Sequence, residues 1–134
     1  MLARIGGGTV LDYGCGKGAL KRALGVPIAE YDPAVAEHAA APSGANLVVC
    51  SDVLEHVEPD CLDAVLDHLQ ALTLRVGYFV IATRKAKKQL ADGRNAHLIV
   101  EPGKWWMQKL EQRFEVRQIS DDGRELIVEV MPCR

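Results

Sequence analysis

Residues 9–18 read TVLDYGCGKG, and this stretch decides the fold of the chain. A short apolar strand ends in an acid, Asp12, and glycine then occupies every second position, at Gly14, Gly16 and Gly18. A helix-like stretch follows at residues 19–24. Glycine allows a sharp turn and lets a ligand lie directly against main-chain N–H groups at the start of a helix. The segment therefore predicts the strand, turn and helix of a nucleotide-binding βα unit.

Two later segments fit the same kind of site. Residues 28–31 predict a second strand, followed by Asp32, which lies twenty residues after Asp12. An acid at about that distance commonly accepts hydrogen bonds from ribose hydroxyls. Residues 47–57 read LVVCSDVLEHV, which predicts a buried strand followed by the start of a helix. The three segments occur in the order that a nucleotide-binding sheet requires.

The glycine spacing is D-x-G-x-G-x-G, which differs from the G-x-G-x-x-G pattern of dinucleotide-binding proteins. With Asp32 and the LEHV segment, it resembles the class I S-adenosylmethionine-dependent methyltransferases, in which similar motifs follow the corresponding strands. The resemblance implies an α/β fold with a Rossmann-like, doubly wound and mostly parallel sheet. It also implies S-adenosylmethionine as the cofactor and methyl transfer as the activity.

The remaining chain alternates helix and strand signals. Apolar residues at helical spacing predict a helix over 60–72, and 76–82 reads as a buried parallel strand. A helix is expected from Pro102 to about Arg113. Two strand-like segments, separated by an Asp-Asp-Gly turn, predict a C-terminal antiparallel hairpin at 114–119 and 125–131. Such a hairpin fits the resemblance, since that family ends its sheet with one antiparallel strand.

The segment between the second predicted strand and residue 47 is short for this family. Residues 33–46 have room for one short helix, so the family's third strand is expected to be reduced or absent. The acid that often follows that strand and binds the adenine amino group then has no counterpart. Only eight residues precede the first strand, so no N-terminal helical cap is expected either. These features predict an open cleft.

Length and composition are those of a compact globular protein. At 134 residues the chain is expected to form one methyltransferase domain over residues 1–134. The formal net charge of −2 gives no general sign of nucleic-acid binding, so that function would depend on local patches. No apolar run approaches the roughly 20 residues needed to cross a bilayer, and no signal peptide opens the chain. We expect no membrane association and a cytoplasmic location.

The cysteines and histidines do not follow a metal-binding spacing. Cys15, Cys50, Cys61 and Cys133 include no C-x-x-C pair, and the four histidines are scattered. The sequence therefore predicts reduced cysteines and no metal.

The resemblance implies a role for each residue at the cofactor. Gly14, Gly16 and Gly18 would approach its methionyl and ribose parts, and Asp12 would anchor the methionine ammonium. Asp32 would bind the ribose hydroxyls. The residues after the strand at 47–50 would border the transferable methyl, because ligands bind at the carboxyl ends of such strands: Ser51, Asp52 and Val53.

Two histidines are candidate general bases. His56 lies in the segment beside the cofactor, and His97 follows a loop that is able to reach over the cleft. A base is needed only if the acceptor loses its proton, and a structural role for His56 or a solvated His97 is the alternative. The N/D-P-P-aromatic signature of enzymes that methylate amino groups of bases is absent, since the residues at 50–53 read CSDV.

A basic segment follows the strand at 76–82. Its charged residues are placed to face an acceptor, and they are Arg84, Lys85, Lys87, Lys88 and Arg94. Trp105 follows and is a candidate for stacking on a base. Three hypotheses remain open: a methyltransferase for an anionic macromolecule, RNA before duplex DNA; a methyltransferase for a small metabolite or glycan, with 84–97 as a lid; and a non-catalytic S-adenosylmethionine-binding module.

Overall fold

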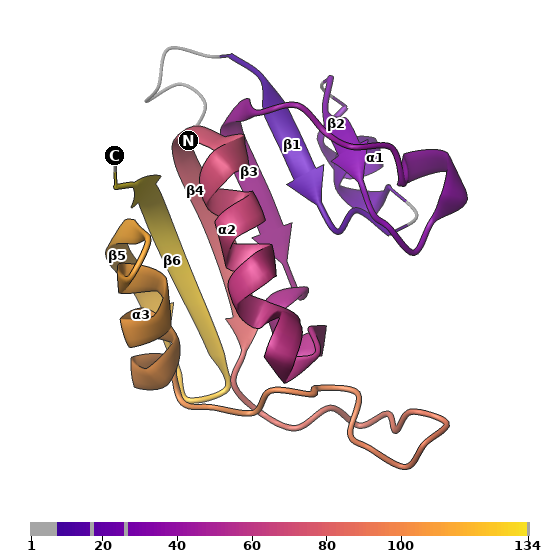
Figure 1. Ribbon diagram of the computed structural model, residues 1–134, viewed down its shortest axis with the longest axis vertical. Coiled ribbons are helices and arrows are strands. Elements are labelled where there is room, and N and C mark those ends of the chain that lie inside the picture. Colours follow the sequence, from indigo (N-terminus) through magenta and orange to yellow (C-terminus); the bar gives the residue numbers. More distant parts are fainter. Residues whose placement is uncertain (1–7, 17, 26, 134) are drawn as a thin grey trace.

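The computed structural model describes residues 8–16, 18–25 and 27–133, which form a twisted sheet with helices on both faces (Figure 1). The strands lie in the order β2-β1-β3-β4-β6-β5. Their bounds are β1 Val10–Tyr13, β2 Ala29–Tyr31, β3 Ala45–Ser51, β4 Thr73–Ala82, β5 Phe114–Asp121 and β6 Glu125–Pro132. Strands β1 to β4 are parallel, and β6 runs antiparallel to both β4 and β5. The predicted mostly parallel sheet with a closing antiparallel hairpin is confirmed.

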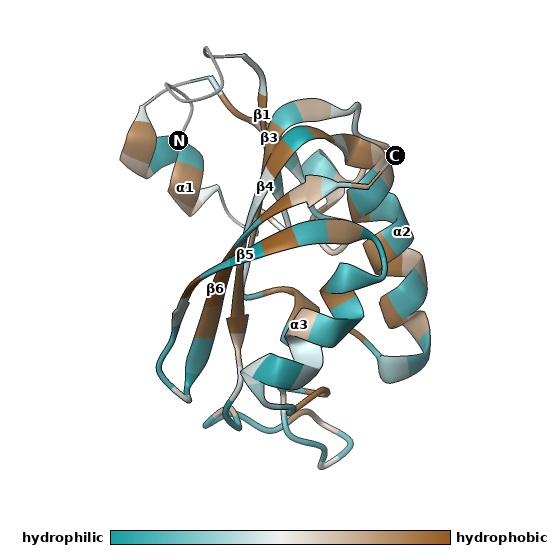
Figure 2. Cartoon of the chain, turned by 90° about the vertical axis from the view of Figure 1, so that its left-hand side faces the viewer, coloured by the Kyte–Doolittle hydropathy of each residue, from teal (hydrophilic) through white to brown (hydrophobic). Residues whose placement is uncertain are grey.

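The helices divide between the two faces of the sheet. Helices α2 (Leu62–Leu72) and α3 (Gly103–Glu111) cover one face, and α1 (Ala19–Leu24) lies on the other (Figure 2). Helix α1 has the predicted bounds. It begins at Gly18, which has a left-handed φ of 81°, and it ends at the left-handed Gly25. The fold is therefore doubly wound, as expected.

The segment after β3 differs from the continuous helix start that the sequence predicts. Two 3₁₀ turns, η3 (Leu54–His56) and η4 (Pro59–Cys61), precede α2. Glu58 is extended, with ψ 132°, because the residue before a proline is sterically disfavoured in the helical region. Helix α2 therefore begins at Leu62 rather than residue 60. Helix α2 ends at Leu72, and β4 begins with the next residue, Thr73. The Thr73 hydroxyl donates a hydrogen bond to the Leu69 carbonyl at 2.6 Å.

The family's third strand is absent from the described chain. Between β2 and β3 the structure has only the 3₁₀ turn η2 (Ala36–His38), and β2 forms the edge of the sheet. The prediction of a reduced or absent strand is confirmed. The sheet therefore ends one strand early, directly beside Asp32.

The main core lies between the sheet and helices α2 and α3. Trp106 and Leu110 of α3 are fully buried against it. A smaller cluster of Val10, Ile28, Leu47 and Val76 lies on the opposite face. Cys15 and Cys50 are buried, and all four cysteines are free thiols. No helix in the described residues is long and apolar enough to cross a membrane.

Candidate functional site

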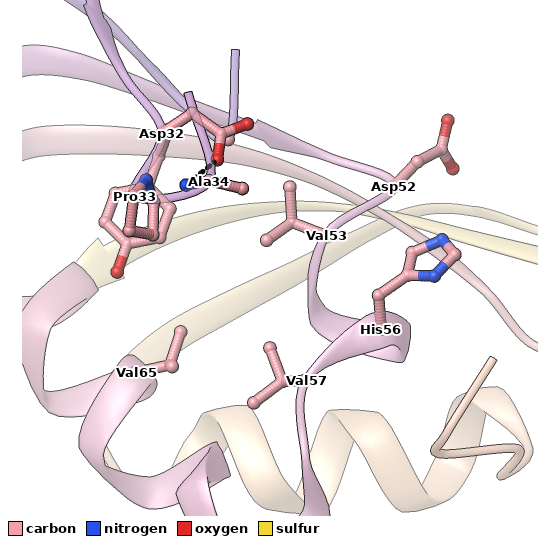
Figure 3. Close-up of a pocket in the computed structure, with 10 residues that line it drawn as sticks. Asp32, Pro33, Ala34, Asp52, Val53, His56, Val57 and Val65 are labelled. Atoms are coloured by element: carbon pink, nitrogen blue, oxygen red, sulfur yellow. Dashed lines mark hydrogen bonds between the residues drawn. The ribbon is translucent and has the colours of Figure 1, made fainter. Parts of the chain in front are cut away.

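A pocket lies where the parallel strands end. Strands β1, β2 and β3 all reach the same edge of the sheet, and the residues that follow them surround a cavity of about 380 Å³ (Figure 3). In Figure 3, Val53 lies between Asp32 on one side and Asp52 with His56 on the other. The pocket is lined by Tyr13, Gly14, Asp32, Pro33, Ala34, Asp52, Val53, His56, Val57 and Val65. Residues distant in the sequence thus meet at the predicted edge.

The glycine turn is held in place by β2. The N–H groups of Gly14 and Cys15 both donate to the Tyr31 carbonyl, at 2.7 and 3.1 Å, and the Gly16 N–H donates to Asp32 Oδ2 at 3.0 Å. Residues at the end of β2 therefore accept these three N–H groups in this structure. The side of Gly16 where a Cβ would project has no atom within 4 Å. A ligand can approach the turn from that side.

Asp32 joins the second strand to the glycine turn. Its Oδ2 accepts the Gly16 N–H, and its Oδ1 accepts the Ala34 N–H at 2.9 Å. A carboxylate has about four acceptor positions, so each oxygen keeps capacity for a further donor. Asp32 is half-buried and lines the pocket, so a ribose hydroxyl can reach it there.

Asp12 lies in β1 beneath the glycine turn and is only 6% exposed. Burial raises the pKa of its carboxyl to about 6, and the negative charges of Glu30 and Asp32 raise it further. Asp12, Gly14 and Ser51 also line a neighbouring cavity of about 450 Å³. A buried carboxylate beside two others favours a cation, and the ammonium of a bound methionyl group would provide one.

Replacing Asp12 with asparagine is expected to stabilise the empty protein at neutral pH. The pKa of the folded state lies above the ordinary value of 3.8, so stability falls as pH rises between these values. The difference in free energy of unfolding between variant and parent should grow from near zero below pH 4 to about 3 kcal/mol above pH 6. Denaturant unfolding at several pH values measures it. A difference that stays constant across this range would contradict a raised pKa of Asp12 as its cause.

Ser51, Asp52 and Val53 lie at the end of β3 as predicted. Asp52 has φ 57°, a left-handed conformation that no other non-glycine residue of the described chain adopts. Its N–H donates to the Val80 carbonyl at 3.0 Å, which fixes the turn against β4. Strain of this kind costs about 1–3 kcal/mol and is concentrated at binding sites. Asp52 and Val53 line the first pocket, and Ser51 lines the neighbouring cavity.

His56 and His97 meet beside the pocket, although about 40 residues separate their segments. The segment at 83–102 leaves β4, folds back and places the His97 ring against the His56 ring, with centroids 4.8 Å apart. His56 Nδ1 lies 2.9 Å from the Ala96 carbonyl, and His97 Nδ1 lies 2.6 Å from the Arg84 carbonyl. His56 is exposed and lines the pocket, whereas His97 is 9% exposed. The structure therefore brings the two predicted bases together.

Glu55 is the residue of this cluster that sequence reasoning missed. Its side chain is fully buried, and its Oε2 accepts the Ala82 N–H at 3.2 Å. Burial raises the pKa of Glu55 to about 7, against the opposing effect of backbone hydrogen bonds, and Asp52 raises it further. A glutamate in a 3₁₀ turn is ordinarily exposed. In the sequence, Glu55 directly follows the apolar Leu54, and this was the one local indication of burial.

The basic segment has one cation that is already paired. Arg94 forms a bidentate pair with Glu58, at 2.9 Å to each oxygen, and also contacts Asp92 at 2.8 Å. The exposed side chains that form no ion pair with a described residue are Arg84, Lys85, Lys87 and Lys88. Arg94 therefore attaches the segment to the residue before η4, and the other four cations remain available to an anion.

Trp105 lies apart from the pocket that His56 lines. Its ring is half-buried and meets the Trp106 ring edge-on, with centroids 5.0 Å apart. It lines a separate cavity of about 360 Å³ with Pro59, Leu62 and Lys109. A stacking role for Trp105 requires an acceptor long enough to reach this second cavity.

The strand order, the glycine turn and the pocket at the carboxyl edge define a Rossmann-like α/β protein that binds a nucleotide-containing cofactor. The family model described as "Methyltransferase domain" matches residues 2–121, and the chain belongs to this family. It is an S-adenosylmethionine-dependent methyltransferase. No curated protein matches the sequence.

Solved structures with the same fold are distant in sequence. A DhpI complex with SAH is 18% identical with a TM-score of 0.69, covering 92% of this chain and 76% of that one. The methyltransferase domain of bacterial CtHen1 is 18% identical with a TM-score of 0.69, covering 97% and 93%. A 1,6-didemethyltoxoflavin-N1-methyltransferase from Burkholderia thailandensis is 18% identical with a TM-score of 0.64, covering 99% and 75%. At these identities the similarity shows the fold.

Proposed function

We propose that this methyltransferase acts on an anionic acceptor, with RNA as the first candidate. The observation that carries the proposal is the set of four exposed cations, without ion pairs to described residues, in the segment after β4. The backbone of this segment contacts both histidines directly, since the Arg84 carbonyl accepts a hydrogen bond from His97 and the Ala96 carbonyl accepts one from His56. Lysine and arginine on such a segment bind phosphates without reading sequence.

The cofactor is proposed to lie across the ends of β1, β2 and β3. Its ribose would bind Asp32, its methionyl part would follow Gly14, Gly16 and Gly18, and its ammonium would pair with Asp12. Ser51, Asp52 and Val53 would border the methyl group. His56 and His97 would then face the acceptor. The described residues after β2 include no third strand, so the apolar side chains of Val57 and Val65 are the proposed contacts for adenine.

The chemistry asks the protein mainly to position the reactants. The methyl carbon of the sulfonium is already activated, so alignment of the acceptor with the carbon–sulfur bond supplies much of the rate. We propose that residues 1–134 act as one methyltransferase domain in this reaction.

Removing the Asp32 carboxylate is expected to weaken cofactor binding by about 1.5–3 kcal/mol, the range for hydrogen bonds to a charged group. Because Asp32 also holds the Gly16 N–H, the alanine variant alone does not isolate the ribose contact. Calorimetry should therefore compare S-adenosylhomocysteine with its 2′-deoxy analogue in the parent and in Asp32→Ala. If Asp32 binds the 2′-hydroxyl, the parent should bind the 2′-deoxy analogue more weakly than S-adenosylhomocysteine. The Asp32→Ala variant should bind the two compounds with nearly equal affinity. Equal costs in both proteins would remove Asp32 from the ribose site.

An RNA acceptor predicts a specific dependence on salt. Replacing Lys87 and Lys88 with alanine should weaken RNA binding and reduce the slope of log affinity against log salt by roughly 0.7 to 1 for each phosphate that the variant no longer binds. The matched control removes two exposed cations elsewhere, Lys104 of α3 and Arg124 of the hairpin turn, and should leave the slope unchanged. Fluorescence anisotropy with single-stranded RNA measures both. No RNA binding by the parent at low salt would end the RNA proposal.

A small metabolite or glycan is the second candidate acceptor. The toxoflavin-type neighbour is named for a small acceptor, which supports this alternative. In this alternative, residues 84–97 would cover the bound molecule as a lid. Methyl transfer from labelled S-adenosylmethionine to fractionated RNA, DNA, protein and small molecules decides between the candidates. Membership of the methyltransferase family gives no support to a non-catalytic module.

A further inference from the structure

Glu55, His56 and His97 form a cluster of three ligand-type side chains at the acceptor side of the pocket. One ligand atom of each residue lies within 4.8 Å of those of the other two. We propose that this cluster binds a divalent transition-metal ion, and that the ion binds an acceptor hydroxyl during methyl transfer. The proposal rests on the proposed function for its role in catalysis, whereas the ion-binding step can be measured independently. The spacing of histidines and cysteines gave no sign of it.

The hydrogen bonds of the two rings leave a free lone pair on each. A carbonyl oxygen only accepts hydrogen bonds, so His56 Nδ1 donates to Ala96 and His97 Nδ1 donates to Arg84. In a neutral imidazole, the other nitrogen, Nε2, is then unprotonated. No described residue donates a hydrogen bond to either Nε2. Backbone carbonyls that fix the tautomer in this way are the usual outer partners of metal-bound histidines.

The buried carboxylate of Glu55 supplies the negative charge. Its Oε2 accepts the Ala82 N–H, but its Oε1 is buried with no hydrogen-bond partner in the described structure. A buried, unpartnered carboxylate oxygen is costly unless a cation or a proton is nearby. Glu55 and the two imidazoles thus bring together acceptors without a matching donor. A cation shared by the three residues satisfies all of them.

The cluster is positioned by a backbone hydrogen bond and a side-chain ion pair, and neither requires a bound metal ion. The Ile99 N–H donates to the Glu55 carbonyl at 3.1 Å, and the Arg94 pair with Glu58 holds the same two segments together. The site is therefore preformed by the fold. Its His56 side opens to the pocket, so further ligands can come from water or from an acceptor.

The ligand types indicate which ions fit. Two imidazoles and one carboxylate favour Zn²⁺, Mn²⁺ or Fe²⁺ over Mg²⁺, which prefers oxygen ligands. Three protein ligands with open positions are typical of catalytic rather than structural metal sites. The three-ligand count and the open side are both present at this cluster.

A bound ion would act on an acceptor hydroxyl in one balanced step. Coordination lowers the pKa of the hydroxyl, and its proton passes to water at the open edge of the pocket. The oxygen then forms a bond to the methyl carbon while the carbon–sulfur bond breaks, and that electron pair remains on sulfur. The products are a methyl ether, S-adenosylhomocysteine and one proton. The acceptor is therefore a hydroxyl compound, and the histidines act as metal ligands rather than bases.

A second cluster provides the internal control. Cys15, Glu30 and His38 also place ligand atoms within 4.8 Å of one another. Glu30 Oε2 is also buried without a hydrogen-bond partner, but Lys21 Nζ lies 4.0 Å from Glu30 Oε1, so a cation already faces this carboxylate. None of its three residues lines the pocket that His56 lines, and His38 has no role in the proposed reaction.

The test measures ion binding directly. Metal-stripped protein is titrated with Mn²⁺, and electron paramagnetic resonance measures the bound ion. Separate titrations with Zn²⁺ and, for comparison, with Mg²⁺ are measured by calorimetry. We expect a single site per chain that Glu55→Gln and His97→Ala each weaken at least about tenfold, while His38→Ala leaves it intact. Glu55→Gln preserves the side-chain shape and an acceptor for Ala82, so it serves if the histidine variant fails to fold. Circular dichroism checks that each variant is folded.

Two results would overturn the inference: no Mn²⁺ or Zn²⁺ binding by the parent, or binding that His38→Ala abolishes and Glu55→Gln does not. The activity measurement separates this failure from that of the proposed function. A chelator should reduce methyl transfer at least about tenfold, and Mn²⁺ or Zn²⁺ should restore it, while the affinity for S-adenosylhomocysteine stays unchanged. If a chelator does not change the rate of methyl transfer, the proposed metal site is rejected and the methyltransferase activity stands.

Discussion

Replacing His97 or His56 with alanine is expected to reduce turnover by at least about 100-fold and to leave cofactor affinity nearly unchanged. The two rings contact each other at the pocket that His56 lines, and their Nε2 atoms accept no hydrogen bond from the described residues. Turnover should fall in either case, whether the rings bind a metal ion or accept a proton. Both roles need the lone pair on Nε2. Single-turnover methyl transfer measures it, with calorimetry of S-adenosylhomocysteine in parallel.

The matched control for this prediction is His38→Ala. His38 is a partly exposed histidine on η2, and its Nε2 lies 4.0 Å from Glu30. This variant should retain the turnover of the parent. A fully active and stable His97→Ala protein would return His97 to a structural role, as a ring that holds the Arg84 carbonyl.

A methyl group at Gly14 is expected to destabilise the fold by about 2–5 kcal/mol and to abolish measurable cofactor binding. Gly14 has φ 82°, and a Cβ there would collide with the Val53 side chain. Backbone strain of about 1–3 kcal/mol therefore adds to an overpacking cost of similar size. Movement of Val53 would also displace the residue beside the proposed methyl site. Denaturant unfolding and calorimetry of Gly14→Ala measure the two effects.

The hairpin turn supplies a control with nearly the same backbone angle. Gly123 has φ 81°, and a Cβ added there would have no atom within 4 Å. Gly123→Ala should therefore lose only the strain energy, about 1–2 kcal/mol. In the double variant Gly14→Ala with Val53→Ala, the collision is removed and part of the stability should return. Equal losses in the Gly14 and Gly123 variants, with no recovery in the double variant, would contradict the close contact with Val53.

The local sequence was sufficient for the order of the elements. The apolar runs and the glycine turn predict β1, α1 and β2, because each depends on neighbours within a few residues. The hairpin of β5 and β6 follows from the Asp-Asp-Gly turn in the same way. Element ends were predicted less well. Helix α2 and strand β4 begin at different residues than expected, since Pro59 and Thr73 set those boundaries through the local backbone and a side-chain bond.

The sequence by itself determined that this chain folds as a class I-type methyltransferase sheet and which residues follow its strands. Parallel strands place the residues that follow them at the same edge of the sheet, and this does not depend on the conformation of the loops. Only the tertiary structure decided what happens beyond that edge. It folded the segment at 83–102 back onto η3, paired Arg94 with Glu58, and joined His97 to His56 above the buried Glu55. The partners lie about 40 positions apart, and the histidines are held by backbone carbonyls. No periodicity or short motif encodes such partners.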